Sequence, residues 1–312
     1  MKHLHVMVGI LRDREGRVLI SRRTVDRAHP GRWEFPGGKL EAGEAPEAGL
    51  RRELREELGI VAGRTRPLIR IHHDYGDFRV LLDVRELESF GGEPQSLEGQ
   101  ALRWLRPEEL DSADILEADA PIIRALRLPD ALLVTPDPRA TPNFLQGLET
   151  AVADGVRLVQ LRAPSLDEGE YLDLARQVLD VCRRHGARLL LNADPAVLLA
   201  VDADGIHLNG RRLARIGERP VPKGKWLSAS CHDRRDLELA ARCGVDFVLL
   251  GPVMPTATHP QALPLGWHGF ERLVEDACFP VYALGGMHPR DIERARLAGG
   301  QGIAAIRSLW NG

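Results

Sequence analysis

Three glutamates in the stretch GGKLEAGEAPEAGLRRELREELGI, residues 37–60, are spaced so that one helix face would carry them all. Glu53, Glu56 and Glu57 stand at positions i, i+3 and i+4, which are neighbours on a helix surface. Three adjacent carboxylates repel one another unless a cation lies between them. Because oxygen-only ligands suit a hard divalent ion, we expect Mg²⁺ or Mn²⁺ at this face.

The Gly37-Gly38 pair ahead of these glutamates would let the backbone approach the ion or a phosphate closely. Magnesium keeps several waters and shares its coordination shell with substrate phosphates. The expected chemistry is therefore attack of water on a phosphoanhydride, with the metal stabilising the phosphate oxygens and activating the water. The alternative is a solvated helix face held by ion pairs such as Arg52–Glu56.

The wider pattern favours the metal site. Gly38, five residues, Glu44, seven residues and then RELREELGI (52–60) match the Nudix box at every defining position. With VGILRD, LISRR and WEFPGGKLEAGE, about residues 3–128 resemble the MutT-type Nudix hydrolases, which remove oxidised nucleotides. The resemblance implies hydrolysis of a nucleoside triphosphate such as 8-oxo-dGTP to the monophosphate and pyrophosphate.

The same resemblance implies a set of metal ligands. These would be Glu53, Glu56 and Glu57 on the helix, the carbonyl group of Gly37, and Glu98 in the segment SLEGQ. One of the glutamates would also serve as the general base, and the sequence does not single it out.

Other residues would support the site or bind substrate. Arg52 would orient the carboxylates through charge-assisted hydrogen bonds, and Glu44 would support the loop and the start of the helix. The resemblance further suggests that Arg23 contacts the phosphate or base of the substrate and that Phe35 lines the nucleobase pocket. Gly38 would contact the substrate through its backbone.

One position departs from the MutT pattern. Where MutT uses an asparagine to read the oxidised purine, LEADAPII places Asp119. Asparagine both donates and accepts, whereas an ionised aspartate only accepts. Asp119 could receive the N–H that 8-oxoguanine carries at N7, but it would need a proton to donate to O6. Base selection is thus retained, altered or relaxed, and the alternative interpretation is that Asp119 is a surface N-cap of the last helix.

The first 129 residues indicate an α+β domain. HVMVGILRD, RVLISRR, residues 79–87 and residues 101–107 have strand-like patterns, and Leu50, Leu54 and Leu58 predict a helix over 45–58. A closing helix is expected over 116–128, with Pro121 in its first turn.

From residue 130 to 312 the pattern changes to eight short apolar runs alternating with helical stretches. Nearly all-apolar strands are typical of a parallel sheet covered on both faces. We therefore predict an α/β (β/α)8 TIM barrel, with a doubly wound open sheet as the alternative. The predicted strands are 131–135, 157–162, 188–192, 205–209, 226–230, 247–251, 281–285 and 302–306.

The motifs LLVTPD, GVRLVQLR, SASCHD, GVDFVLLGPVMPTATHP and PVYALGGMHPRDI make residues 131–312 resemble thiamine-phosphate synthase and its TenI-like relatives. Phosphate commonly binds such barrels at the loops after strands seven and eight, and glycine backbone N–H groups there can face it. The resemblance implies that the barrel binds a thiamine-pathway phosphate. The residues implied are Gln160, Arg162, Asn192, Ser230, Gly285, Gly286 and Ser308.

Several positions of that family pattern are replaced. Ala163-Pro164 stands where a lysine is expected, Ala193 where an acid is expected, and GRRLAR (210–215) follows GIHLN where an acidic Mg²⁺ ligand is expected. His259 replaces a further lysine. Tautomerase-like or purely ligand-binding relatives are therefore alternatives, with His207 or His259 as a proton-transfer group or as structural histidines.

Composition limits the remaining possibilities. The chain has 312 residues, 44% hydrophobic and 28% charged, with a formal net charge of -3, so bulk charge gives no support for a nucleic-acid polymer or membrane partner. The four cysteines contain no C-x-x-C pair, which favours free thiols and a cytoplasmic location. No signal-like or membrane-spanning segment is expected.

The leading hypothesis is a Nudix pyrophosphohydrolase joined to a barrel that binds a phosphorylated ligand. A second hypothesis is a transferase that makes thiamine phosphate, with the Nudix half hydrolysing diphosphates of the thiamine pathway. A third is a non-catalytic barrel that senses a ligand. The replaced acidic and basic positions favour the third over the second.

Overall fold

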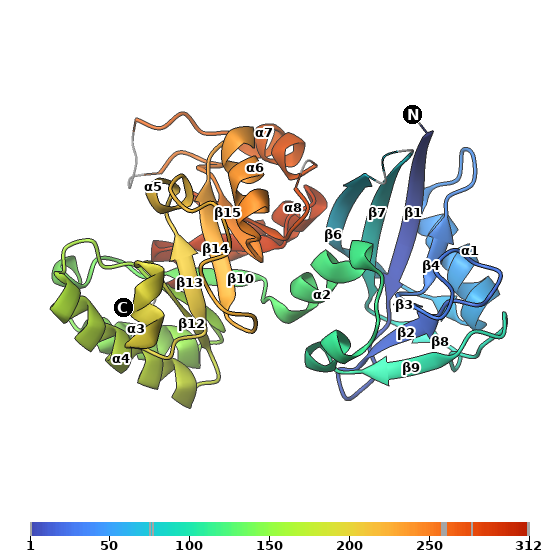
Figure 1. The fold of residues 1–312 in the computed structure, drawn as a ribbon, viewed down its shortest axis with the longest axis horizontal. Coiled ribbons are helices and arrows are strands. Elements are labelled where there is room, and N and C mark those ends of the chain that lie inside the picture. The colour runs from blue at the N-terminus through green and yellow to red at the C-terminus, as the bar shows by residue number, and fades with distance from the viewer. Residues whose placement is uncertain (1, 75, 77, 257–260, 276, 311–312) are drawn as a thin grey trace. The chain divides into compact units, whose positions relative to one another are not determined.

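The computed structural model describes residues 2–74, 76, 78–256, 261–275 and 277–310 (Figure 1). The chain divides into two compact units, Met1–Arg127 and Leu128–Gly312. In the described part of the chain, no helix has the length and apolar character needed to cross a membrane.

The N-terminal unit is built on small mixed sheets. A four-stranded sheet has the order β4-β1-β7-β6, a second sheet has the order β3-β2-β9, and β5 pairs with β8. The central pair, β1 and β7, is parallel, whereas β4 and β6 run antiparallel to their neighbours. The strands are β1 (Lys2–Ile10), β2 (Val18–Arg22), β3 (Trp33–Glu34), β4 (Gly37–Lys39), β5 (Val61–Ala62), β6 (Thr65–Asp74), β7 (Phe78–Leu87), β8 (Phe90–Gly91) and β9 (Leu102–Leu105).

The α1 helix (Pro46–Leu58) confirms the leucine periodicity. Leu50, Leu54 and Leu58 are fully buried in one cluster with residues of β1 and β2. Pro46 occupies the first turn, where its missing N–H costs no hydrogen bond. Gly59 ends the helix in the left-handed conformation at φ 69°. The helix is thereby fixed beside β4, which carries the diglycine pair.

The four predicted strands correspond to β1, β2, β7 and β9, whereas β3, β4, β5, β6 and β8 are not expected from the sequence. In β6, Pro67 interrupts the strand pattern. A register shift between Pro67 and Ile69 lets the pairing with β7 continue past the proline. The unit closes with the 3-10 turns η1 (Pro107–Ser112) and η2 (Glu117–Asp119) and the helix α2 (Ala120–Arg127). The expected closing helix is therefore confirmed, with its first turn in 3-10 form.

The C-terminal unit is a closed barrel of eight parallel strands in sequential order. All eight predicted strands are confirmed and the open-sheet alternative is wrong, because β10 and β17 pair and close the sheet. The strands are β10 (Ala131–Val134), β11 (Leu158–Leu161), β12 (Arg188–Leu191), β13 (Gly205–Leu208), β14 (Trp226–Cys231), β15 (Phe247–Leu250), β16 (Val281–Leu284) and β17 (Gly302–Ala305).

Two apolar layers stabilise this barrel. Phe247, Tyr282 and Leu190 belong to a buried cluster of side chains from alternate strand positions, and a larger cluster joins the other strand faces to the helices. The helices are α3 (Phe144–Ala153), α4 (Glu168–Arg184), α5 (Gly210–Leu213), α6 (Arg234–Cys243), α7 (Gly266–Val274) and α8 (Ile292–Leu297), with 3-10 turns η3 (Pro138–Ala140), η4 (Pro195–Leu199), η5 (Pro289–Asp291) and η6 (Arg307–Leu309).

Candidate active site

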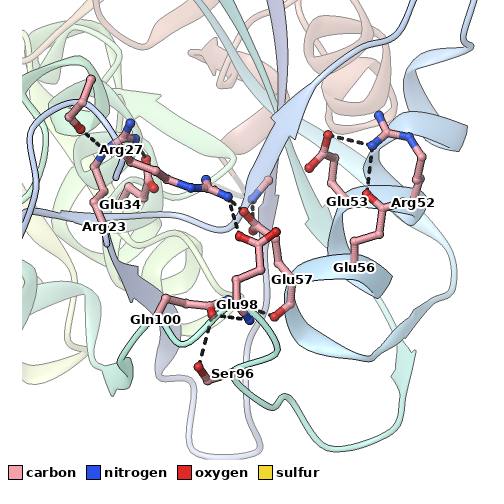
Figure 2. Close-up of polar contacts among 12 residues, drawn as sticks. Arg23, Arg27, Glu34, Arg52, Glu53, Glu56, Glu57, Ser96, Glu98 and Gln100 are labelled. Atoms are coloured by element: carbon pink, nitrogen blue, oxygen red, sulfur yellow. Dashed lines mark hydrogen bonds and ion pairs between the residues drawn. The ribbon is translucent and has the colours of Figure 1, made fainter. Parts of the chain in front are cut away.

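Arg52 pairs with two of the three α1 glutamates, Glu53 and Glu56 (Figure 2). Its guanidinium lies 2.8 Å from Glu53 Oε1 and 3.2 Å from Glu56 Oε2. It also donates to both carboxylate oxygens of Glu44, at 3.0 and 2.9 Å. The hydrogen bonds to Arg52 lower the pKa of Glu44. Arg52 thus orients three carboxylates at once, and Glu44 links the helix to its preceding loop by accepting the Glu41 N–H at 3.1 Å.

Glu57 and Glu98 face a different cation. Glu57 Oε1 lies 3.2 Å from Arg27 Nη1, and Glu98 Oε2 lies 2.5 Å from Arg27 Nη2. The second oxygen of Glu57 accepts the Gly37 N–H at 3.1 Å. Arg27 comes from the loop after β2, so this contact joins segments far apart in the sequence (Figure 2).

Glu57 carries an incompletely compensated charge. It is only 5% exposed, and burial, reinforced by the neighbouring Glu98 and Glu34, raises the pKa of Glu57 to about 7 despite the Gly37 N–H and Arg27. A buried carboxylate of this kind gains from a further positive charge beside it. This is the strongest local indication of a cation site.

The expected metal ligands form two pairs. Glu53 and Glu56 turn to Arg52, while Glu57 and Glu98 turn to Arg27, and among the described residues no three acidic, histidine or cysteine side chains gather as a metal-binding group. The donor chemistry nevertheless fits Mg²⁺, because all donors are oxygens.

Glu53 and Glu57 both reach the diglycine pair, which lies in strand β4 rather than in the expected turn. A Cβ on Gly38 would lie 2.1 Å from Glu53 Oε2, so only glycine leaves room for that carboxylate. Gly37 adopts φ 145° and donates to Glu57. Glu53 and Glu57 therefore both lie against the diglycine pair, whereas Glu56 and Glu98 form no hydrogen bond with it in the described part of the chain.

Gln100, which was not predicted from the sequence, holds the backbone around Glu57 and Glu98 in place. Its side chain donates to the Glu57 carbonyl at 2.9 Å and accepts the Glu98 N–H at 3.0 Å and the Ser96 hydroxyl at 3.2 Å. It thereby fixes the Glu98 loop to the end of α1. The polar run SLEGQ contained this residue, but nothing in its spacing pointed to the helix.

The expected base-reading residues lie around a buried carboxyl. Asp119 is 6% exposed, so the surface N-cap interpretation is wrong. Its Oδ2 accepts the Phe35 N–H at 3.4 Å. Burial, with Glu34 as the next contribution, raises the pKa of Asp119 to about 7. Phe35 is 4% exposed, and its side chain belongs to the apolar core. Its hydrogen bond to Asp119 is made by the backbone N–H.

Arg23 is engaged within the protein. Its guanidinium forms an ion pair with Glu34 and donates to the Ala28 carbonyl at 2.5 Å. Burial raises the pKa of Glu34, which Arg23 partly offsets. Glu34, which the sequence reading did not select, thus links the proposed phosphate or base contact to the Asp119 region.

In the barrel, five of the expected phosphate-binding residues line one cavity of about 290 Å³ at the strand ends: Gln160, Arg162, Gly285, Gly286 and Ser308. The two glycines adopt φ 95° and 69°, and the Ser308 hydroxyl donates to the Met287 carbonyl at 2.7 Å. Within the described part of the chain, the buried Gln160 Oε1 has no hydrogen-bond partner. A polar atom without a partner here leaves one acceptor available to a ligand.

The remaining expected residues, Asn192 and Ser230, line an adjoining groove of about 1280 Å³. Arg162 and His232 line both spaces. His232 was missed from the sequence, although SASCHD placed it directly after a strand. Its Nδ1 lies 2.5 Å from the Gly251 carbonyl, which fixes the ring.

His207 is buried inside the barrel between two hydroxyl groups, 2.9 Å from Ser228 Oγ and 2.8 Å from Ser230 Oγ. Burial, and then the charge of Arg212, lower the pKa of His207 to about 3. The ring is therefore neutral at physiological pH, and the interpretation of His207 as a structural histidine is the one that fits. The alternative candidate, His259, lies outside the described residues.

The first unit carries a Nudix box with a buried glutamate, and the second is a closed β/α barrel with a cavity at its strand ends. A family described as "NUDIX domain" matches residues 1–126, and one described as "Thiamine monophosphate synthase" matches residues 131–309. The chain belongs to the thiamine monophosphate synthase family through its barrel and carries a NUDIX domain ahead of it.

Individual relatives agree with this assignment. A "Putative thiamine-phosphate synthase 2" of Aquifex aeolicus is 34% identical over 181 residues, which cover 58% of this chain and 97% of the relative. A "Putative thiamine-phosphate synthase" of Geobacter sulfurreducens is 36% identical over 169 residues, covering 54% and 79%.

Solved structures match each half. A MutT from a study of Aliivibrio salmonicida and Vibrio cholerae is 32% identical, covering 40% of this chain and 97% of that one, with a TM-score of 0.36. The thiamine phosphate pyrophosphorylase of Pyrococcus furiosus is 24% identical, covering 57% and 85%, with a TM-score of 0.48.

Proposed function

We propose that the N-terminal unit, taken as residues 1–129, is a Mg²⁺-dependent pyrophosphohydrolase. Its substrate would be an oxidised nucleoside triphosphate such as 8-oxo-dGTP, cleaved to the monophosphate and pyrophosphate. The observation that carries this proposal is the buried Glu57 carboxylate, held against Gly37 within a complete Nudix box.

The residues of the chain divide the work of this reaction. Bound Mg²⁺ would stabilise charge on the phosphate oxygens and activate water. Glu53, Glu57 and the Gly37 carbonyl group would hold the ion, and Arg52 fixes the direction of Glu53. Water adds across the anhydride between the α- and β-phosphates, and one of the glutamates accepts its proton.

Asp119 supports the choice of an oxidised purine. Its pKa of about 7 means that a protonated carboxyl is well populated near neutrality. A protonated carboxyl carries one O–H donor and one acceptor oxygen, which supplies the donor to O6 that an ionised aspartate lacks. The proton on Asp119 would thus replace the N–H donor that is lost where aspartate stands in place of asparagine.

The test compares pyrophosphate release from 8-oxo-dGTP and dGTP by the full chain in Mg²⁺. We expect kcat/KM for 8-oxo-dGTP to exceed that for dGTP by at least about tenfold, the effect of roughly one hydrogen bond. Excess EDTA should abolish both activities. Comparable rates for the two nucleotides would contradict the sanitising function, although the pyrophosphohydrolase class would stand.

For the barrel, taken as residues 130–312, we propose binding of a phosphorylated ligand such as a thiamine-pathway phosphate. The cavity formed by Gln160, Arg162 and the Gly285-Gly286 turn supports it. The second candidate, synthesis of thiamine phosphate, is favoured by the family membership. Against it stand Ala163-Pro164 and Ala193 at positions where that family pattern carries charge.

Incubation of the chain with the pyrimidine diphosphate and thiazole phosphate separates these candidates. We expect no thiamine phosphate, as measured by chromatography, and robust product would establish the transferase instead. A cytoplasmic location is also proposed, supported by four cysteines outside disulfide bonds, three of them buried.

A further inference from the structure

Arg212 places a positively charged side chain of the protein itself in the lining of the barrel groove. Arg212 lies on α5, directly after β13, and its Nη1 donates to Asn192 Oδ1 at 3.1 Å. Asn209 fixes the start of that helix by accepting the Arg212 N–H at 3.0 Å. The charge of Arg212 also contributes, after burial, to the low pKa of the buried His207.

The three aspartates that line the same groove already accept backbone hydrogen bonds. Asp194 accepts the Ala196 N–H at 3.0 Å, Asp236 accepts the His232 N–H at 2.9 Å, and Asp167 accepts the Glu170 N–H at 2.9 Å. Each carboxylate thus holds a helix or turn start rather than facing a shared point.

These residues do not fit the divalent cation that the family pattern implies for such a barrel. Ala193 follows Asn192 without a carboxylate, and a guanidinium occupies the amide oxygen of Asn192. No group of three acidic, histidine or cysteine side chains suitable for a metal exists within the described ranges. A second cation placed here would be repelled by Arg212.

Arg162 adds a second positive charge. It lines both the cavity and the groove, and among the described residues its guanidinium has no hydrogen-bond or ion-pair partner. Guanidinium groups bind phosphate oxygens in pairs of parallel hydrogen bonds. Arg162 and Arg212 together carry the same charge as one Mg²⁺ ion. Both line the groove, and Arg162 also lines the cavity of the Gly285-Gly286 turn.

We propose that Arg212 replaces the divalent cation in this barrel, so that the barrel binds a phosphate or diphosphate oxyanion without metal. The N-terminal unit, in contrast, requires the metal. This inference rests on the proposed phosphate binding by the barrel and adds its metal independence. It also accounts for the loss of acidic positions of the family pattern beside Asn192 and after β13, while Gln160 and Arg162 are kept.

The test is isothermal titration of the full chain with inorganic pyrophosphate in excess EDTA. Under these conditions the glutamate site of the N-terminal unit has no metal with which to bind the probe. We expect one pyrophosphate per chain, with Kd raised at least about tenfold by Arg212→Gln, a loss of about 1.4 kcal/mol. Arg215→Gln removes an exposed arginine two residues beyond the end of the same helix and should change Kd less than about twofold.

Further variants keep the outcome decisive. Arg212→Lys keeps the charge and should retain part of the affinity, and circular dichroism checks that each variant is folded. Binding that is absent in EDTA, appears with Mg²⁺ and depends on Arg212 would overturn metal independence while preserving phosphate binding. Equal Kd values for Arg212→Gln and the unmodified chain would remove Arg212 from the site. No binding in either condition would overturn the proposed phosphate binding as well.

Discussion

Replacement of Asp119 by asparagine tests how one buried carboxyl affects both stability and base selection. Burial, with Glu34 next, raises the pKa of Asp119 from an ordinary 3.8 to about 7. Since each tenfold change in proton affinity corresponds to about 1.4 kcal/mol, full ionisation of Asp119 in the folded chain costs about 4 kcal/mol. Replacing Asp119 by a residue that does not ionise should therefore increase the free energy of unfolding by up to this amount at high pH.

The sign of the pH dependence follows from linkage. Between about pH 4 and pH 7 the folded chain binds a proton at Asp119 that the unfolded chain has lost, so stability falls as pH rises across this window. Below pH 4 Asp119 is protonated in both the folded and the unfolded chain, so its ionisation no longer lowers the free energy of unfolding. Asparagine keeps an acceptor for the Phe35 N–H and does not titrate. The variant should therefore be similar to the original near pH 4 and up to about 4 kcal/mol more stable at pH 8.

Hydrogen exchange measured by mass spectrometry on peptides containing Phe35 gives the local stability without interference from the barrel. Asp114→Asn is the matched control, because Asp114 is exposed and pairs with Arg32 at the surface. A stability difference that is the same at pH 5 and pH 8 would show that Asp119 does not titrate in this range.

The same substitution should change base selection. In the original chain, the ratio of kcat/KM for 8-oxo-dGTP over dGTP should fall by about tenfold from pH 6 to pH 8, as the O–H donor of Asp119 is lost. In Asp119→Asn the ratio should hardly depend on pH. A ratio that is independent of pH in the original chain would refute the role of the proton in purine reading.

Three further predictions concern the glutamate site. Glu57→Gln should lower kcat for pyrophosphate release at least about 100-fold, whereas Glu41→Gln, at an exposed position, should stay within about twofold; unchanged activity would remove Glu57 from the site. Arg27→Gln removes the charge that faces Glu57 and should tighten Mn²⁺ binding several-fold by electron paramagnetic resonance, since competition is lost; weaker binding would contradict the competition. Gly38→Ala should displace the carboxylate that lies over it and reduce activity with little change in Tm, whereas Gly37→Ala would place Cβ 2.1 Å from a β1 carbonyl oxygen at a φ of 145° and should lower Tm strongly. Equal Tm values for the two alanine variants would contradict this distinction.

Local patterns in the sequence were sufficient for most of the fold. Each barrel strand could be predicted from its own apolar run, because a strand covered on both faces is apolar throughout and does not alternate with polar residues. Strand β6 was missed because the effect of Pro67 depends on a bulge against β7, a feature of pairing rather than of one segment. The Leu50, Leu54 and Leu58 periodicity placed α1 correctly because one side of that helix is buried.

The site was less accessible to sequence reasoning, because its decisive contacts join distant segments. Spacing indicated that Glu57 shares a helix face with Glu53, but not that Glu57 is buried and bonded to Gly37. Arg27 is 71 positions from Glu98 in the chain, and only the folded loop brings their charges together. In the barrel, the substitution pattern indicated that acidic positions were lost, but not that Arg212 reaches Asn192.

In the proposed functions, the two units hold phosphate oxygens with opposite sets of charges. In the N-terminal unit the protein supplies carboxylates, which bind phosphate only through a cation of higher charge, and Arg27 and Arg52 neutralise those carboxylates in the structure. In the barrel the protein supplies Arg162 and Arg212 directly, and Asp167 of the same groove caps the start of α4. A carboxylate site is consequently controlled by metal concentration, whereas a guanidinium site is controlled by ionic strength. Chelation should therefore abolish hydrolysis and leave phosphate binding by the barrel intact.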